Sequence, residues 1–282
     1  MNHSLMIEQP KASRKRGDAT DRWIGLRRRA RTPRLRFITF PYAGSGASAY
    51  RRWLTDLAHE DWLDFVVVQL PGREKRISEP PYTEIGPLLG ELEWVLSALV
   101  DLPYVLFGYS MGALLAYELA LRLAVRGAVP QHLILAASTP PYRVRERAFR
   151  VTLKRDDLIA KIRRLGGTAP SLIDSDLFGD YFLPTLQADF ALVDNFYREV
   201  PQVLPCPLLA LGARDDPEVA VDQIQAWGAA AGRGFEVRLF NGGHFFLHSV
   251  HEEVIALVNT VVGRYRVDEQ ACSGVSLGDR CS

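Results

Sequence analysis

The chain has 282 residues, of which 48% are hydrophobic and 24% charged, and its formal net charge is +1 at pH 7. A chain of this size buries an ordinary core, so we expect one α/β domain with tails. It has neither a run of about 20 apolar residues nor an apolar stretch after its first N-terminal charges, so we expect no membrane span, no membrane partner and no export signal.

The N-terminal segment is strongly basic. Residues 1–36 contain eleven Lys or Arg against three acidic residues, a net charge of +8, which leaves −7 for the remainder. We expect residues 1–20 to be a disordered extension and residues 21–266 to form the domain. Because the domain is net acidic and shows no stripe of interleaved basic and aromatic residues, we expect no nucleic-acid partner.

Six short apolar segments have the composition of β-strands and are bounded by Pro, Gly or charged residues. They are residues 35–40, 65–70, 104–109, 132–138, 207–213 and 235–240. Most are apolar throughout, which is typical of parallel strands that are covered by helices on both faces. Segments whose apolar residues recur at helical spacing lie between or after many of them, at residues 50–58, 85–100, 111–127 and 250–265. The alternation predicts an α/β fold with a doubly wound, mostly parallel sheet.

The third predicted strand leads into the sequence GYSMG at residues 108–112. Gly-x-Ser-x-Gly occurs by chance, but here a buried strand precedes it and a helix follows it. That context is typical of a nucleophile elbow, a strained turn that raises a serine hydroxyl above the sheet. We therefore expect Ser110 to be a nucleophile rather than a serine in a structural turn, and we expect the α/β-hydrolase fold.

A serine nucleophile needs a base that a third group orients. In α/β-hydrolases the acid and then the histidine follow the serine along the chain, each after a later strand. Of the six histidines, only His244 comes directly after a predicted strand, in FNGGHFFL. Gly242 and Gly243 permit a tight loop there. The sequence therefore predicts His244 as the base.

Two adjacent carboxylates, Asp215 and Asp216, follow the predicted strand at 207–213. Both cannot face His244. Pro217 initiates a turn after Asp216, which favours Asp216 as the acid and leaves Asp215 as a solvated or turn-capping residue. The spacing alone leaves both assignments open.

Acyl transfer also needs two backbone N–H groups to bind the oxyanion of the tetrahedral intermediate. One is expected from Met111, directly after the nucleophile, and the other from Ala43 in the loop FPYAGSGASAY. The glycines of this loop also resemble a phosphate cradle. The loop lacks the Lys-Ser/Thr of a P-loop and the G-x-G-x-x-G spacing of a dinucleotide site.

Residues 140–205 carry no strand signal, whereas residues 156–165 and 183–200 show helical spacing. This predicts a helical lid inserted between the fourth and fifth strands. One apolar face consists of Leu183, Leu186, Phe190, Val193 and Phe196. Simple packing on the core would explain this face, and even then we expect its helix to roof the groove above the serine.

Residues 267–282 are small and polar, so we expect a disordered tail. The three cysteines, Cys206, Cys272 and Cys281, lie near no cluster of His or Asp. We expect neither a disulfide framework nor a metal site, as in a protein of the reducing cytoplasm.

Six segments resemble the successive signatures of type II thioesterases, the stand-alone α/β-hydrolases of polyketide and nonribosomal peptide (antibiotic) biosynthesis. The resemblance runs from about residue 21 to residue 266. The segments are FPYAGSGASAY, LPGREKRISEPP, FGYSMGALLAYELA, LPTLQADFALVDNFY, LGARDDPEV and GGHFFL.

The resemblance implies a catalytic triad of Ser110, Asp216 and His244, with the amides of Ala43 and Met111 as oxyanion donors. It implies that the protein, expected to be a monomer, removes unwanted acyl groups from the phosphopantetheine arms of acyl or peptidyl carrier proteins. Because that arm arrives on the substrate, no bound cofactor or metal is required.

Two departures from the family pattern concern the size of the pocket. The family usually has His at the position of Tyr109, and its oxyanion loop more often reads H-A-G-G-S than Y-A-G-S-G. Because fold and triad do not define the substrate, a carboxylesterase or lipase that acts on oxygen esters is an alternative. A non-catalytic binding protein of the same fold is a second alternative.

Overall fold

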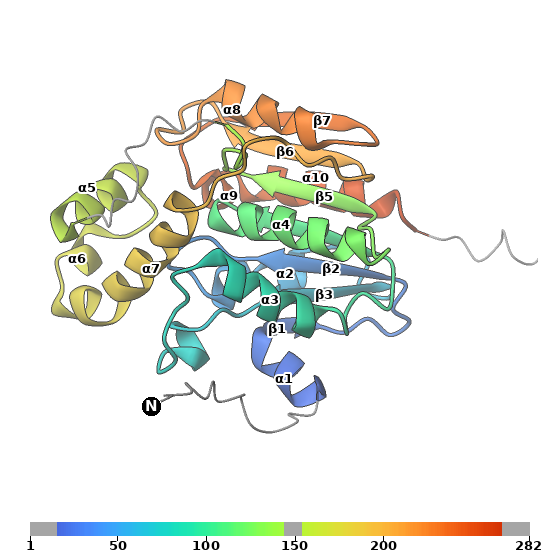
Figure 1. Ribbon diagram of the computed structural model, residues 1–282, viewed down its shortest axis with the longest axis horizontal. Coiled ribbons are helices and arrows are strands. Elements are labelled where there is room, and N and C mark those ends of the chain that lie inside the picture. Colours follow the sequence, from blue (N-terminus) through green and yellow to red (C-terminus); the bar gives the residue numbers. More distant parts are fainter. Residues whose placement is uncertain (1–15, 144–153, 267–282) are drawn as a thin grey trace, which may run out of the picture.

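The computed structural model describes residues 16–143 and 154–266. Its centre is a seven-stranded sheet with the order β1-β3-β2-β4-β5-β6-β7 (Figure 1). The strands are β1 (Ile24–Arg28), β2 (Leu35–Phe40), β3 (Leu63–Val68), β4 (Tyr104–Tyr109), β5 (His132–Ala136), β6 (Leu208–Ala213) and β7 (Phe235–Phe240). All neighbouring strands are parallel except β1 and β3, which are antiparallel. The predicted doubly wound sheet is confirmed.

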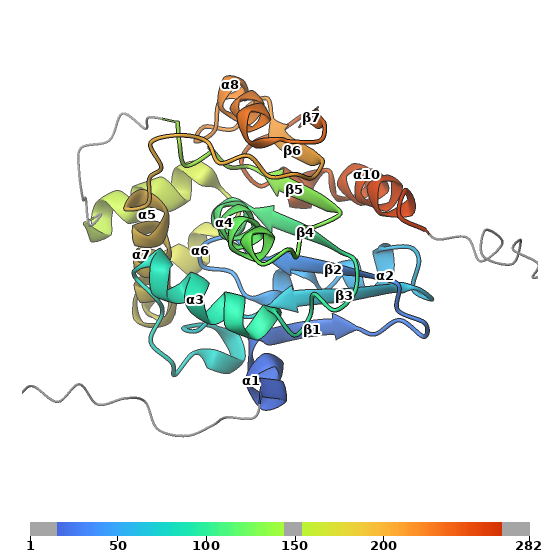
Figure 2. The same ribbon diagram turned by 45° about the vertical axis from the view of Figure 1, so that its right-hand side comes forward.

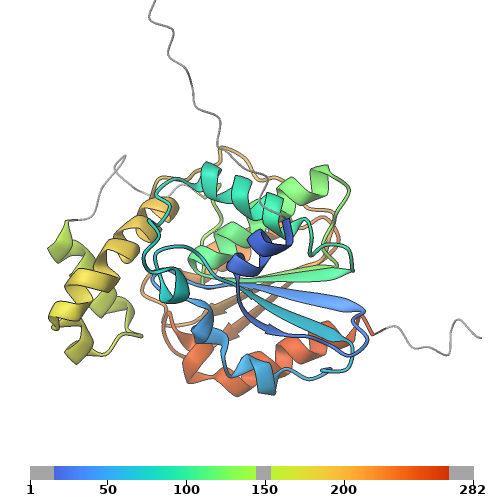
Figure 3. The same ribbon diagram turned by 90° about the horizontal axis from the view of Figure 1, so that it is seen from below.

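Helices cover both faces of this sheet (Figure 3). One face carries α1 (Arg16–Trp23), α3 (Ile85–Leu96) and α4 (Met111–Val125), and the other carries α2 (Trp53–Asp56) and α10 (His251–Gly263). Along β2, Ile38 and Phe40 belong to the first apolar cluster, whereas Phe37 belongs to the second. Alternate residues of one strand are thus buried on opposite faces, which explains why the strands are apolar throughout.

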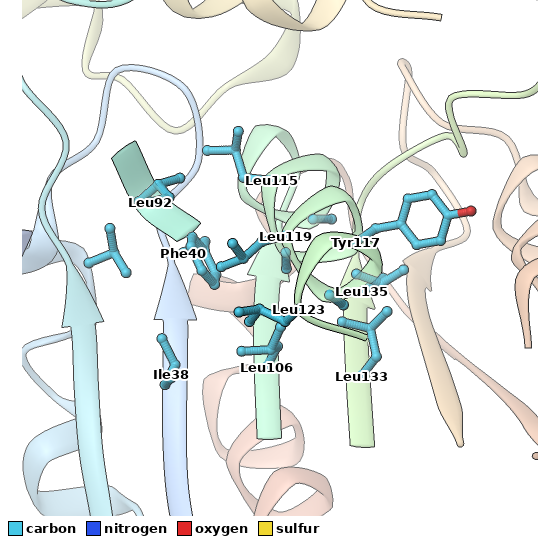
Figure 4. Packing of buried hydrophobic residues seen from close by; sticks show 14 of the residues in the cluster. Ile38, Phe40, Leu92, Leu106, Leu115, Tyr117, Leu119, Leu123, Leu133 and Leu135 are labelled. Atoms are coloured by element: carbon cyan, nitrogen blue, oxygen red, sulfur yellow. The ribbon is translucent and has the colours of Figure 1, made fainter. Parts of the chain in front are cut away.

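The core beneath α4 is made of leucine side chains that interdigitate with the strands (Figure 4). Leu115, Leu119 and Leu123 recur at intervals of four on α4, and Leu106 of β4 lies below them. All four are at most 1% exposed. Because a fully buried leucine contributes about 1.5–3 kcal/mol, this row holds α4 firmly on the sheet. The first residue of α4 follows Ser110, so the packing also positions the nucleophile elbow.

Sequence reasoning missed strand β1, because residues 24–28 lie in the strongly basic N-terminal segment and contain no continuous apolar run. In the structure, both Asp64 oxygens bind Arg27, at 2.7 and 3.1 Å, and Arg36 binds one of them at 2.8 Å. Arg28 donates to the carbonyl oxygens of Leu54 and Leu57. A charged segment is therefore part of the sheet because its charges are paired within the domain.

The structure also moves the expected N-terminal boundary. Helix α1 includes residues 16–20, which were assigned to the extension. Thr20 is buried and its hydroxyl donates to the carbonyl oxygen of Val95 on α3, at 3.4 Å. The remaining part of the expected extension and the expected tail at 267–282 lie outside the described residues.

Several predicted elements differ in extent. Strand β3 begins two residues before the predicted segment, and residues 50–58 form only the end of a 3-10 turn, η1 (Ala47–Tyr50), and the single turn α2. Four further elements between the predicted ones were not predicted, because each is too short to show periodicity. These are the 3-10 helix η2 (Glu74–Arg76), α8 (Val221–Gln225), the 3-10 helix η4 (Ala226–Ala230) and α9 (Phe246–Ser249).

The predicted insertion after β5 contains helices, as expected. They are α5 (Arg155–Leu165), α6 (Pro170–Ile173), the π-helix η3 (Phe178–Phe182) and α7 (Leu183–Asp194). Figures 1 and 2 show them gathered beyond the carboxyl ends of the parallel strands. Helix α7 ends at Asp194, so Phe196 does not belong to the helical face on which it was placed.

The ion pairs of Asp64 support a prediction on stability. Asp64 has a side chain 2% exposed, and Arg36 has one 6% exposed. Replacing Asp64 by Asn should lower the free energy of unfolding by about 3 kcal/mol, because it removes the buried carboxylate charge that pairs with Arg27 and Arg36 and leaves Arg36 only its pair with the exposed Asp101. Urea denaturation measures this change. The matched control is Asp61→Asn, whose pair with Arg31 is exposed and should contribute less than about 1 kcal/mol. Equal effects of the two substitutions would contradict the prediction.

Candidate active site

Ser110 occupies a strained turn between β4 and α4. Its backbone φ of 53° and ψ of −115° lie in a region that residues other than glycine rarely adopt. The strand and the helix approach so closely that a Cβ at position 108 would meet the carbonyl oxygen of Gly112 at 2.1 Å. A Cβ at position 112 would meet the carbonyl oxygen of Phe40 at 2.2 Å. Both glycines of the motif are therefore required by space.

Three side chains from separate loops form one hydrogen-bonded row. The Nε2 atom of His244 lies 3.1 Å from the hydroxyl oxygen of Ser110, and its Nδ1 atom lies 2.8 Å from Oδ2 of Asp216. The three residues follow β4, β7 and β6, whose carboxyl ends meet at one edge of the sheet. The structure thus brings together the serine, the histidine and one carboxylate that were expected to interact.

The structure also separates the two candidate carboxylates. The Asp216 side chain is 1% exposed, and its second oxygen accepts the N–H groups of Glu218 and Val219, at 2.8 and 3.2 Å. These bonds hold the carboxylate toward His244. Asp215 is exposed, and its backbone N–H donates to the carbonyl oxygen of Gly242. Asp216 is therefore the carboxylate placed against the imidazole.

Tyr109, which precedes the serine, holds the histidine loop. Its hydroxyl donates to the carbonyl oxygen of His244 and accepts the N–H of Leu247 at 3.4 Å. Burial raises the pKa of Tyr109, which keeps the phenol protonated as a donor. Tyr109 is fully buried. The departure from the family pattern at this position therefore affects the support of His244, whereas we expected an effect on pocket size.

Ala43 and Met111 both line the cavity in front of Ser110. Met111 is the first residue of α4, where an N–H group has no acceptor within the helix. Ala43 lies in a turn closed by the N–H of Ser45, which donates to the carbonyl oxygen of Tyr42. The two expected oxyanion donors thus line the same cavity as the serine, one from the loop after β2 and the other from the first residue of α4.

The cavity has a volume of about 760 Å³ and lies between the sheet edge and the lid. Its walls include Ser110 and His244 on one side and apolar lid residues on the other; these are Ile162, Leu172, Phe178, Phe182, Leu186 and Phe190. Leu186, Phe190 and Val193 of the predicted α7 face line the cavity, whereas Leu183 packs within the lid. Most of that face therefore roofs the groove above the serine.

Sequence reasoning missed a polar cluster in the cavity wall. Glu218, two residues after Asp216, lies 2.6 Å from the Lys161 ammonium and 2.7 Å from the Arg164 guanidinium, both on α5. The Lys161 ammonium also lies 4.6 Å from the ring centre of Phe190. These contacts attach the lid to the loop of the acid. No local pattern could reveal them, because the partners are more than 50 residues apart in the chain.

The chain is similar to known proteins along most of its length. The Thioesterase domain family matches residues 36–262. The chain belongs to the thioesterase family. This thioesterase is 34% identical over 231 residues to the "Probable cadicidin biosynthesis thioesterase" of Streptomyces griseus, covering 82% of the chain and 63% of that protein. It is 30% identical over 250 residues to "Linear gramicidin dehydrogenase LgrE" of Brevibacillus parabrevis, covering 87% of the chain and 94% of that protein.

Among solved structures, the thioesterase is similar to the type II thioesterase BorB from the borrelidin biosynthetic cluster. The two share 32% identity and a TM-score of 0.73, over 86% of this chain and 98% of the other. The predicted α/β-hydrolase fold and the predicted resemblance to type II thioesterases are confirmed. The thioesterase is accordingly a hydrolase enzyme of this family.

Within residues 16–143 and 154–266, no helix is long and apolar enough to cross a membrane. Across the same ranges, no group of three or more His, Cys, Asp or Glu side chains is arranged to hold a metal ion.

Proposed function

We propose that this thioesterase hydrolyses acyl thioesters on the phosphopantetheine arm of acyl or peptidyl carrier proteins, with Ser110, His244 and Asp216 as its triad. The observation that carries the proposal is the row of hydrogen bonds from the Ser110 hydroxyl through His244 to Asp216, which opens onto an apolar cavity under a lid. The names of the Streptomyces relative and of BorB, both from biosynthetic pathways, support the class of substrate.

In the first half of the proposed reaction, the Ser110 oxygen attacks the thioester carbonyl carbon while Nε2 of His244 takes the hydroxyl proton. Asp216 orients the imidazole and stabilises its positive charge. The N–H groups of Ala43 and Met111 bind the negative oxygen of the tetrahedral intermediate, a stabilisation of about 3 kcal/mol per donor. The carbon–sulfur bond then breaks, and His244 returns the proton to the departing thiol.

In the second half, water attacks the carbonyl carbon of the acyl-Ser110 ester, and His244 accepts one proton of the water. Collapse of the second tetrahedral intermediate breaks the ester bond, and the serine oxygen recovers its proton from the imidazolium. The products are a free acid and the original enzyme. His244 carries every transferred proton, first from Ser110 to the thiol and then from water to Ser110, so the proposed reaction uses no bound cofactor.

The shape of the site supports a slender substrate. The cavity lies beneath lid residues such as Leu186 and Phe190, and a pantetheine arm is a narrow chain that can carry a thioester to a covered centre. The Brevibacillus relative is named as a dehydrogenase, which is a different class of enzyme. The arrangement around Ser110 instead suits acyl transfer, because it joins a nucleophile, a base and a carboxylate.

The deciding measurement compares kcat/KM for acetyl, propionyl and longer acyl groups on a carrier protein, on coenzyme A and on p-nitrophenyl esters. We expect the carrier thioesters to react at least about tenfold faster than the coenzyme A thioesters, since about 1.4 kcal/mol of extra contact suffices. Selectivity among short acyl groups should be modest, about tenfold per methylene at most.

Other outcomes of that measurement would favour the alternatives. A clear preference for the oxygen esters would identify a carboxylesterase, and equal values on both thioester carriers would remove the carrier protein as the recognised partner. Binding of acyl compounds without turnover would identify a non-catalytic binding protein.

A further inference from the structure

We infer that Asp189, in the middle of the lid helix α7, is a positioning residue for the oxyanion loop. Its Oδ2 atom accepts the backbone N–H of Gly44 at 2.7 Å. Gly44 directly follows Ala43, whose N–H is the proposed oxyanion donor. One carboxylate of the lid is therefore bonded to the loop on which stabilisation of the transition state depends. The inference rests on the proposed function.

The Asp189 carboxylate is held in place by a bidentate ion pair. Arg73 donates from Nη1 to Oδ2 at 2.7 Å and from Nη2 to Oδ1 at 2.8 Å. The side chains of Asp189 and Arg73 are 1% and 6% exposed. A fork of two parallel hydrogen bonds between a guanidinium and a carboxylate is strong and also fixes the orientation of the carboxylate, so the Asp189 oxygen that faces Gly44 can move little.

Arg73 is itself bonded to the surrounding loops. Its Nε donates to the carbonyl oxygen of Pro71 at 3.0 Å, and its Nη1 lies 3.5 Å from the carbonyl oxygen of Ser45. One turn before Asp189 on α7, the Thr185 hydroxyl donates to the carbonyl oxygen of Gly72 at 2.7 Å. Helix α7 thus contacts the oxyanion loop through Asp189 and the neighbouring loop through Thr185.

The planarity of the peptide group gives the Gly44 bond its effect. Fixing the N–H of Gly44 fixes the plane of the peptide between Ala43 and Gly44. The N–H of Ala43 can then move only through the φ and ψ angles of that one residue. An oxyanion donor acts only when it is held at the place where charge develops. Loss of this restraint should therefore reduce stabilisation of the transition state more than it reduces the affinity for the substrate.

The test replaces Asp189 by Asn, which keeps the shape of the side chain, removes its charge and, in either orientation of the amide, places an NH2 donor against an Arg73 donor, so that the fork no longer holds the acceptor of the Gly44 N–H. We expect kcat for a carrier-bound acyl thioester to fall about 10- to 100-fold, with KM changed less than about threefold. The affinity for an acyl trifluoromethyl ketone, which forms an oxyanion adduct with the serine, should fall by the same factor as kcat/KM. The affinity for the non-reactive thioether analogue of the substrate should not change.

Thr185→Val is the matched control, because it removes a buried hydrogen bond of the same helix and leaves the Gly44 bond intact. It should lower Tm and keep kcat within about threefold of the wild type. Arg73→Lys serves if the Asn variant fails to fold; it keeps the charge, loses the fork and should lower kcat and ketone affinity together, by less than Asp189→Asn.

Three results would overturn the inference. They are a folded Asp189→Asn enzyme with wild-type kcat, a fall in kcat without a fall in ketone affinity, and an equal loss of kcat in Thr185→Val. A wild-type protein that hydrolyses no acyl thioester would instead overturn the proposed function. The two failures are therefore distinguishable in one set of assays.

Discussion

Replacing Ser110 by alanine should lower kcat for an acyl thioester by at least about 10⁴-fold. In the proposed mechanism the substitution removes the atom that forms the acyl-enzyme, so His244 then has no nucleophile to activate. Stopped assays with purified protein measure the residual rate. Circular dichroism and Tm should remain those of the wild type, because only one hydroxyl is lost.

The same experiment should include His244→Ala and the double variant. Members of a triad act as one unit, so the double variant should be about as slow as either single variant. Additive losses would indicate that the two residues act independently. Substantial turnover by a correctly folded Ser110→Ala protein would show that another group performs the reaction.

Replacing Asp216 by Asn should lower kcat by about 10⁴-fold. The Asp216 carboxylate lies 2.8 Å from Nδ1 of His244, so its charge both orients the ring and stabilises the imidazolium. An amide at this position lacks the charge and is able to favour the wrong tautomer. The rate should be measured near pH 7 with an acyl thioester at saturating concentration.

Asp215→Asn is the matched control for this prediction. The two carboxylates are adjacent in the chain, but Asp215 is exposed and is held through its backbone N–H. Its replacement should change kcat less than about threefold. A large loss in Asp215→Asn together with a small loss in Asp216→Asn would reverse the assignment of the acid.

Much of the architecture was predictable because its determinants are local in the chain. Parallel strands covered on both faces leave continuous apolar runs, and all six predicted runs are strands in the structure. The elbow was predictable for the same reason, since Gly108, Ser110 and Gly112 lie between one strand and one helix. His244 could be selected because it is the histidine that directly follows a strand.

The limits of sequence reasoning are equally specific. Strand β1 was not predicted because the partners of its arginines are more than 25 residues away: Asp64 for Arg27, and the carbonyl oxygens of Leu54 and Leu57 for Arg28. Asp215 and Asp216 have the same chemistry and nearly the same position in the chain. Only the turn that directs one carboxylate inward, with the N–H groups of Glu218 and Val219 on its second oxygen, separates them.

The amino-acid sequence by itself determined the six parallel strands, the nucleophile elbow and the order of serine, carboxylate and histidine along the chain, because apolar periodicity and turn residues act over a few neighbours. The tertiary structure alone decided which carboxylate meets His244, which face of α7 roofs the cavity, and that Asp189 is bonded to Gly44. The physical reason is that these contacts join residues distant in the chain, and their hydrogen bonds form only when packing has excluded water and aligned both partners.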